Sequence, residues 1–211
     1  MPRRTTRFIS AQYYHFYNRG VNRQAVFFER DNYLYFLRGM KRYLCGELDI
    51  LAYCLMPTHY HILVRVKGRG EQTSEVLETS EVLDVSHRVS HAMQLLGISY
   101  TKAINKRFDR VGALFQGQFQ GKPVMQEKHL LTLCYYIHAN PVKDGLVAQP
   151  EDWEYSNYLE WLNLRAGTLV NREFIADHFE TPDAYRALVM EYIKTRKLPD
   201  AVRKYLERLE G

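Results

Sequence analysis

The chain contains 211 residues, which is enough for one large domain or for one domain with a helical appendage. Hydrophobic residues make up 46% and charged residues 25%, as is typical of a soluble globular protein. The net charge of +5 permits a polyanionic partner without requiring one. No apolar run has membrane-spanning length, no signal-peptide core follows the N-terminus, and the three cysteines give no disulfide framework. We therefore expect a cytoplasmic protein that does not cross a membrane.

Segments with strand and helix patterns alternate along the first two thirds of the chain. The expected elements are a strand over 12–18, a helix over 31–46 capped by Asp31, strands over 49–56 and 59–66, a helix over 86–106, a strand over 117–125, and a helix over 127–139 stopped by Asn140-Pro141. A tandem hexapeptide at 73–84 is interpreted as a local duplication in a surface loop.

The order of these elements predicts an α+β, ferredoxin-like fold. Strand, helix, strand, strand, helix and strand make the split β-α-β unit, a four-stranded antiparallel sheet with helices on one face. The composition changes after Asp144-Gly145, so we expect a core domain over 1–147 and a C-terminal helical extension over 148–211. The extension has no evident catalytic grouping, and whether its helices cover a site or grip a ligand stays open.

Two histidines lie one residue apart at the start of the predicted strand over 59–66. Side chains alternate on a strand, so His59 and His61 point to the same face. Two imidazoles side by side can form half of a metal site. The alternative is a pair of strand histidines with ordinary hydrogen bonds, because short motifs also occur by chance.

A tyrosine and an asparagine lie one helical turn apart on the predicted helix over 127–139 and at its end. Tyr136 and Asn140 share a face, whereas Tyr135 is rotated by about 100° and faces with His138. Tyr136 is therefore favoured over Tyr135 as a nucleophile, with core packing as the alternative. Asn140 is a candidate third metal ligand, with a helix C-cap as its alternative role and His138 as a possible substitute ligand.

Four motifs in this order resemble a known family. The chain is similar to the single-tyrosine HUH transposases and most closely to the REP-associated tyrosine transposases of bacteria. The resemblance covers roughly residues 12–160, and Tyr60 and the duplication at 73–84 depart from the family pattern. The motifs are Tyr17-Asn18-Arg19-Gly20-Val21-Asn22-Arg23-Gln24, Met56-Pro57-Thr58-His59-Tyr60-His61, Gly112-Ala113-Leu114-Phe115-Gln116-Gly117 and Tyr136-Ile137-His138-Ala139-Asn140-Pro141-Val142.

The resemblance implies that residues 1–147 form an HUH catalytic domain that acts on single-stranded DNA hairpins of palindromic repeats. It implies cleavage by Tyr136 through a 5′-phosphotyrosine link that leaves a free 3′-OH. A divalent ion, Mg²⁺ or Mn²⁺, held by His59, His61 and Asn140 would polarise the scissile phosphate. The sequence leaves open whether the protein is a monomer or a homodimer.

Several polar and basic residues near these motifs are candidate DNA contacts. Arginine and lysine would bind phosphate, whereas amides could read bases. The alternative for the cations is solvated surface charge. The predicted contacts are Arg19, Asn22, Arg23, Arg107, Arg110, Gln118 and Lys122, with Gln120 as a further candidate for base reading.

Two other classes of function remain open at the level of sequence. A ferredoxin-like sheet with aromatic residues can bind single-stranded DNA or RNA without cutting it. A metal-dependent phosphoesterase is the second alternative, and in such an enzyme Tyr136 would be dispensable and no covalent adduct would form.

Overall fold

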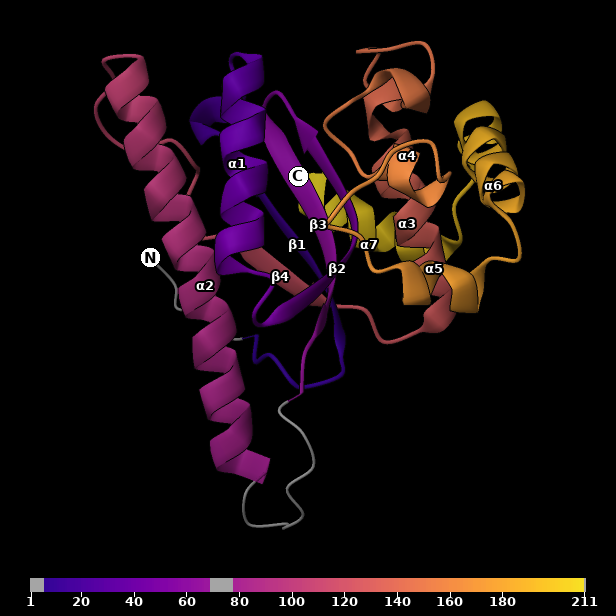
Figure 1. Cartoon of the computed structure of the whole chain (residues 1–211), viewed down its shortest axis with the longest axis horizontal. Coiled ribbons are helices and arrows are strands. Elements are labelled where there is room, and N and C mark those ends of the chain that lie inside the picture. Colours follow the sequence, from indigo (N-terminus) through magenta and orange to yellow (C-terminus); the bar gives the residue numbers. More distant parts are fainter. Residues whose placement is uncertain (1–5, 69–77, 211) are drawn as a thin grey trace.

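The computed structural model describes residues 6–68 and 78–210. A four-stranded antiparallel sheet lies between two layers of helices (Figure 1). Its strand order, β2-β3-β1-β4, places the first and third strands at the centre, so the predicted α+β fold is confirmed. The strands are β1 (Tyr13–Arg19), β2 (Leu48–Met56), β3 (His59–Val66) and β4 (Gln120–Pro123).

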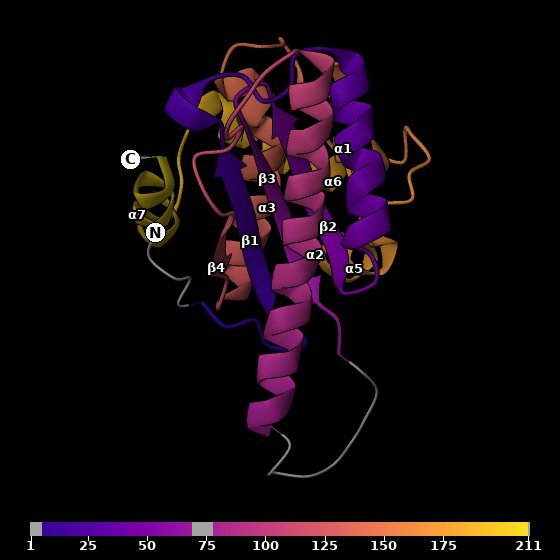
Figure 2. The ribbon, with the colours of Figure 1, turned by 90° about the vertical axis from the view of Figure 1, so that its left-hand side faces the viewer.

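The two helices inserted between the strands cover one face of the sheet, as the split β-α-β order predicts. These are α1 (Arg30–Tyr43) and α2 (Glu78–Arg107), which pack on each other and against the sheet (Figure 2). Tyr14, Phe16, Tyr60 and Ile62 point into this layer and are almost fully buried. Their spacing is the period of two that places alternate strand residues on one face.

The helix that follows β4 covers the opposite face of the sheet. This helix, α3 (Glu127–Lys143), packs on β2 and β3. The C-terminal helices complete this second layer, and Figure 2 shows α7 beside the β1–β4 edge. They are α4 (Tyr158–Trp161), α5 (Arg172–His178), α6 (Pro182–Thr195) and α7 (Asp200–Glu210), preceded by the 3-10 turn η2 (Pro150–Asp152).

Several predicted helix ends differ from the structure, and α1 ends at Tyr43 rather than at residue 46. The N-cap of α1 is Glu29 rather than Asp31, because Glu29 and Asn32 form a capping box that satisfies backbone donors at the helix start. Helix α3 does not stop at Asn140-Pro141 but continues to Lys143, with Pro141 inside it. Proline removes only its own N–H donor, and the backbone N–H of Asp144 still bonds to the carbonyl of Asn140 at 2.9 Å.

Two other elements differ in length from the sequence prediction. Strand β4 has four residues, so the segment just before it, with Gln118, is outside the sheet. Helix α2 begins at Glu78, so the second copy of the hexapeptide, 79–84, is helical instead of part of a loop. The first copy, except for Glu78, lies outside the described residues. Over the described parts of the chain, no helix combines the length and apolar character required to cross a bilayer.

Candidate active site

The histidine pair lies on the face of the sheet that α3 covers. The rings of His59 and His61 have their centroids 5.0 Å apart, as expected for alternate residues of one strand. Tyr60, between them, points to the other layer and packs against Phe36 and Phe115. The departure from the family pattern at Tyr60 therefore lies on the face opposite the histidines.

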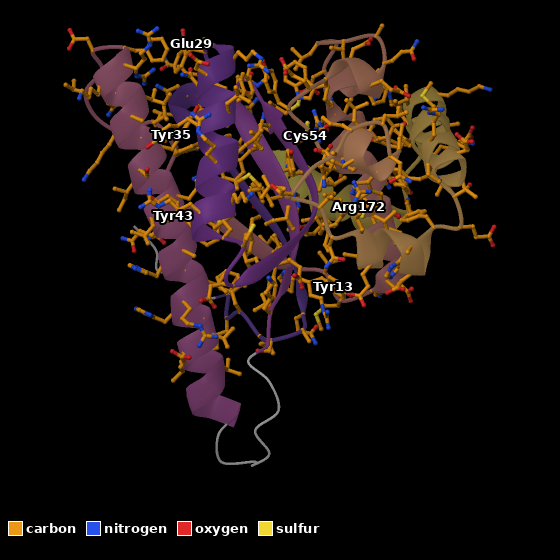
Figure 3. The ribbon with its side chains drawn as sticks, in the orientation of Figure 1. Tyr13, Glu29, Tyr35, Tyr43, Cys54 and Arg172 are labelled. Atoms are coloured by element: carbon orange, nitrogen blue, oxygen red, sulfur yellow. The ribbon has the colours of Figure 1, made fainter. Side chains whose placement is uncertain are left out.

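The register of β1 brings further side chains to the same face. Directly paired residues of antiparallel strands point to the same side, so Arg19 lies beside His59, and Tyr17 lies beside His61. Gln120 of β4 continues the row of His61 and Tyr17. Figure 3 labels Cys54, the β2 residue that pairs with His61 and ends this row.

A hydrogen-bonded chain links His61 to the C-terminal extension. The Nδ1 atom of His61 lies 2.9 Å from Nε2 of His15, and Nδ1 of His15 lies 3.0 Å from the hydroxyl of Tyr205 on α7. Burial lowers the pKa of His15 to about 3. Burial also holds the pKa of His61 well below its usual value, and the nearby His59, His15 and Lys143 lower it further. Both imidazoles are therefore neutral at physiological pH.

Helix α3 presents three functional groups along one face. Tyr136 and Asn140 are one turn apart and each is only 2% exposed, and Lys143 follows after another three residues. The ring of Tyr136 lies 6.1 Å from that of His61. The Nζ atom of Lys143 donates to the Tyr136 hydroxyl at 3.4 Å and lies 5.2 Å from the centre of its ring. The structure thus brings the predicted nucleophile next to the histidine strand.

The rival residues on α3 point elsewhere. The hydroxyl of Tyr135 donates to Thr132 at 3.1 Å. His138 lies between Tyr185 and Asn157, with distances of 2.5 and 2.8 Å from its two ring nitrogens. Because both nitrogens of His138 are occupied, it is not a substitute metal ligand. The proposed capping role of Asn140 is also wrong, since the C-cap of α3 is Asp144.

The donor set suits a divalent ion only if Asn140 or a substrate oxygen joins the histidines. Within residues 6–68 and 78–210, no group of three or more His, Cys, Asp or Glu side chains could hold a metal ion. Asn140 has a buried amide nitrogen, Nδ2, with no hydrogen-bond partner. The nitrogen and oxygen of a side-chain amide are nearly the same size. Rotation of the Asn140 amide by half a turn would therefore place its oxygen at the position of Nδ2. A buried polar atom without a partner is typical of a position that a bound ligand completes.

The predicted DNA contacts fall into four groups, and Arg107 and Arg110 form the last of them. Arg19, Asn22 and Arg23 lie at the end of β1, where Gly20 N–H bonds to the carbonyl of Thr58, next to His59. Gln118 is exposed in the segment before β4. Lys122 is exposed and pairs with His15 on the face of the sheet that carries His59 and His61, called the site face below.

Arg107 and Arg110 do not join the site face. Arg107 is the last residue of α2, in the other helical layer, and Arg110 lies in the segment that follows this helix. The Nε atom of Arg107 bonds to Glu29 at 3.1 Å, and the guanidinium of Arg110 lies 5.6 Å from the ring of Phe28. Figure 3 labels Glu29 at the end of the molecule where α2 terminates.

Four side chains near the site were not identified from the sequence. His15 and Tyr17 alternate along β1, which was a detectable signal, but only the register places them next to His61. Lys143 shares a helix face with Tyr136 at a spacing of seven residues, beyond the expected helix end. Tyr205 gave no local signal, because its contact with His15 joins positions 190 residues apart.

The comparisons with known proteins point in one direction. No protein-family model matches the chain. A Haemophilus influenzae protein described as a "Putative REP-associated tyrosine transposase" is 24% identical over 110 residues, which is 52% of this chain. The chain thus spans little more than half, 58%, of that relative's length.

Solved structures add a likeness in fold. A REP-associated tyrosine transposase bound to a REP hairpin superposes with a TM-score of 0.58 and 17% identity, over 81% of this chain and 94% of that chain. A bacterial tRNA(His) guanylyltransferase (Thg1)-like protein in complex with GTP gives a TM-score of only 0.41, at 10% identity over 66% of this chain and 64% of that chain. In sequence and in fold, the chain resembles the REP-associated tyrosine transposases, as its four motifs predict.

Proposed function

We propose that the protein is a transposase that nicks single-stranded DNA at palindromic hairpins and transfers the cut strand through a 5′-phosphotyrosine intermediate. The observation that carries the proposal is the position of Tyr136, whose ring lies 6.1 Å from His61 and whose hydroxyl accepts a hydrogen bond from Lys143. A nucleophilic tyrosine requires such assistance, because a phenol with a pKa of about 10 is a poor nucleophile at neutral pH.

In the proposed cleavage, the phenolic oxygen of Tyr136 attacks the scissile phosphorus, and the bond from phosphorus to the 3′-oxygen breaks. The phenol loses its proton, and the departing 3′-oxygen gains one to become a free 3′-OH. Lys143 stabilises the negative charge on the phenolic oxygen as that proton leaves. Strand transfer reverses these steps with a different 3′-OH, so the phosphodiester energy is conserved in the phosphotyrosine bond.

His59, His61 and Asn140 would hold a divalent ion, Mg²⁺ or Mn²⁺, with oxygen atoms of the DNA completing its shell. When bound, the ion would polarise the scissile phosphate and stabilise its developing charge. Arg19, Lys122 and the turn with Asn22 and Arg23 border this face and suit contact with the DNA backbone. Tyr136 is 2% exposed without DNA, so a phosphodiester reaches it only after neighbouring side chains move.

The test is covalent capture of a hairpin oligonucleotide. Hairpins from palindromic repeats of the protein's own genome are incubated with the protein and Mn²⁺ or Mg²⁺, and the products are run on denaturing gels. Tyr136→Phe removes the nucleophile, and Tyr135→Phe is the matched control because its hydroxyl bonds to Thr132 away from the site. We expect a metal-dependent adduct with the wild type and Tyr135→Phe but not with Tyr136→Phe.

Other outcomes would favour the alternative functions. A shift on native gels without an adduct, for every oligonucleotide and both ions, would contradict cleavage and favour a binding protein. Metal-dependent phosphoester hydrolysis that survives Tyr136→Phe would favour a phosphoesterase.

A further inference from the structure

A line of three polar side chains crosses the second layer from the last helix to the histidine strand. His15 of β1 lies between the other two residues. Its Nδ1 atom is 3.0 Å from the hydroxyl of Tyr205 on α7, and its Nε2 atom is 2.9 Å from Nδ1 of His61 on β3. His15 is completely buried and His61 is 6% exposed. Both ring nitrogens of His15 are therefore occupied by protein partners, which excludes His15 as a metal ligand and leaves it a role between Tyr205 and His61.

The line admits two arrangements of its protons. The two neutral imidazoles meet through Nε2 of His15 and Nδ1 of His61, so one of these two nitrogens carries the proton and the other accepts it. In the first arrangement, Nδ1 of His61 donates to His15, Nδ1 of His15 donates to the Tyr205 oxygen, and Nε2 of His61 carries a lone pair. In the second, every bond is reversed and Nε2 of His61 carries a proton. Only the first arrangement leaves His61 able to bind a ligand, because a ligating imidazole nitrogen must be unprotonated.

We propose that Tyr205 and His15 are positioning residues that hold the proton of His61 on Nδ1 and keep its Nε2 atom available as a ligand. The geometry supports this arrangement, because Nδ1 of His61 is occupied by His15 and only Nε2 is left to meet a ligand. The choice of this arrangement rests on the proposed function, since it follows from the use of Nε2 as a ligand, whereas the hydrogen-bonded line itself does not. Partners behind a ligating histidine commonly fix its tautomer and its orientation in this way.

Helix α7 is anchored so that Tyr205 is held against β1. Val202 and Leu206, which flank Tyr205 on the helix, are 1% and 4% exposed in the core between the C-terminal helices and the sheet. The C-terminal extension thereby forms part of the support of His61. By linkage, any change that undocks α7 weakens the binding of a ligand at His61, and such a ligand in turn stabilises the docked helix.

The test compares two tyrosine-to-phenylalanine variants with matched chemistry. Tyr205→Phe removes the hydroxyl at the end of the line. Tyr185→Phe is the control, because the Tyr185 hydroxyl lies 2.5 Å from Nδ1 of another buried histidine, His138, within the same layer. Long-range proton–nitrogen NMR spectra of the metal-free proteins report which ring nitrogen of each histidine carries the proton. Calorimetric titration with Mn²⁺ reports affinity, and urea unfolding reports stability.

We expect wild-type His61 to be protonated on Nδ1 and to lose this preference in Tyr205→Phe. We also expect Tyr205→Phe to weaken Mn²⁺ binding by about 10-fold. Tyr185→Phe should lower stability to a similar degree and leave both the His61 signal and Mn²⁺ affinity unchanged. Tyr205→Phe results that match those of Tyr185→Phe would overturn the proposal, and so would a wild-type His61 protonated on Nε2. If the wild type binds no Mn²⁺, the metal role fails, while the NMR comparison still decides the proton position.

Discussion

The ammonium group of Lys143 lies 3.4 Å from the phenolic oxygen of Tyr136, on the same face of α3 and two turns further along the helix. Burial of a phenol normally opposes its ionisation. A neighbouring cation has the opposite effect, since it stabilises a phenolate. If Tyr136 is the nucleophile, as proposed, we expect the chemical step to depend on Lys143, a residue outside the predicted nucleophile and ligands.

We expect Lys143→Met to slow formation of the covalent DNA adduct by about 100-fold, a loss typical of removing one charge-stabilising donor. Lys143→Arg should recover part of the rate, because it keeps the positive charge. Single-turnover rates with a labelled hairpin provide the measurement. Lys128→Met, at an exposed position near the start of α3, is the control and should leave the rate unchanged. A wild-type rate in Lys143→Met would contradict the assigned role.

Asn140→Ala should separate ligand binding from stability. Its Nδ2 atom is buried without a hydrogen-bond partner, so its loss should change the free energy of unfolding by less than about 1 kcal/mol. Loss of a ligating amide should weaken Mn²⁺ binding by at least about 10-fold. Urea unfolding and calorimetric titration measure the two effects. Unchanged Mn²⁺ affinity would show that Asn140 is not a ligand.

The placement of the basic residues predicts which of them contribute to DNA affinity. Arg19 pairs with His59, and Lys122 pairs with His15, so both lie on the site face, whereas Arg107 bonds to Glu29 in the other layer. Arg19→Ala and Lys122→Ala should each weaken hairpin binding and lower the slope of log affinity against log salt by about 1. Arg107→Ala should change the slope less. Fluorescence anisotropy at several salt concentrations tests this, and equal slope changes for all three variants would refute it.

Buried neutral histidines should make the fold sensitive to acid. Burial lowers the pKa of His138 from 6.5 to about 4. Between these values the unfolded chain binds a proton that the folded chain does not, so stability is complete above pH 6.5 and falls as the pH decreases towards 4. His138 alone should remove about 2 kcal/mol of unfolding free energy between neutral pH and pH 5.

The measurement is urea unfolding in metal-free buffer at pH 7.5 and pH 5, with His138→Gln as the comparison. Glutamine can offer one donor to Asn157 and one acceptor to Tyr185 but does not titrate, so the acid loss should be smaller in this variant. An equal loss in both proteins would show that His138 does not carry this pH dependence.

Local periodicity was sufficient to predict most of the fold and which candidate side chains share a face. The alternation in β3 placed His59 and His61 on one face, and the four-residue spacing on α3 paired Tyr136 with Asn140 and excluded Tyr135. These relationships depend only on the geometry of a single strand or helix, which the sequence specifies directly.

The parts that could not be predicted depend on contacts between elements. His15 meets His61 diagonally across two strands, and that meeting depends on the register of β1 against β3. Tyr205 requires the docking of α7, which no local pattern encodes. The position of Lys143 was missed because the tendency of proline to end helices was given too much weight at Pro141. The N-cap of α1 is Glu29 rather than Asp31, because Glu29 and Asn32 form a reciprocal capping box that outweighs the usual preference for aspartate at the N-cap.

The continuation of α3 through Pro141 has a mechanical consequence. Because the helix runs unbroken to Lys143, one continuous helix carries the phenol of Tyr136, the amide of Asn140 and the ammonium of Lys143 at fixed intervals along its axis. A translation or rotation of α3 would move all three groups together relative to the histidines on β3. The spacing of the three groups along α3 is thus fixed by the helix, and we expect any adjustment on DNA binding to change their distances from the sheet together.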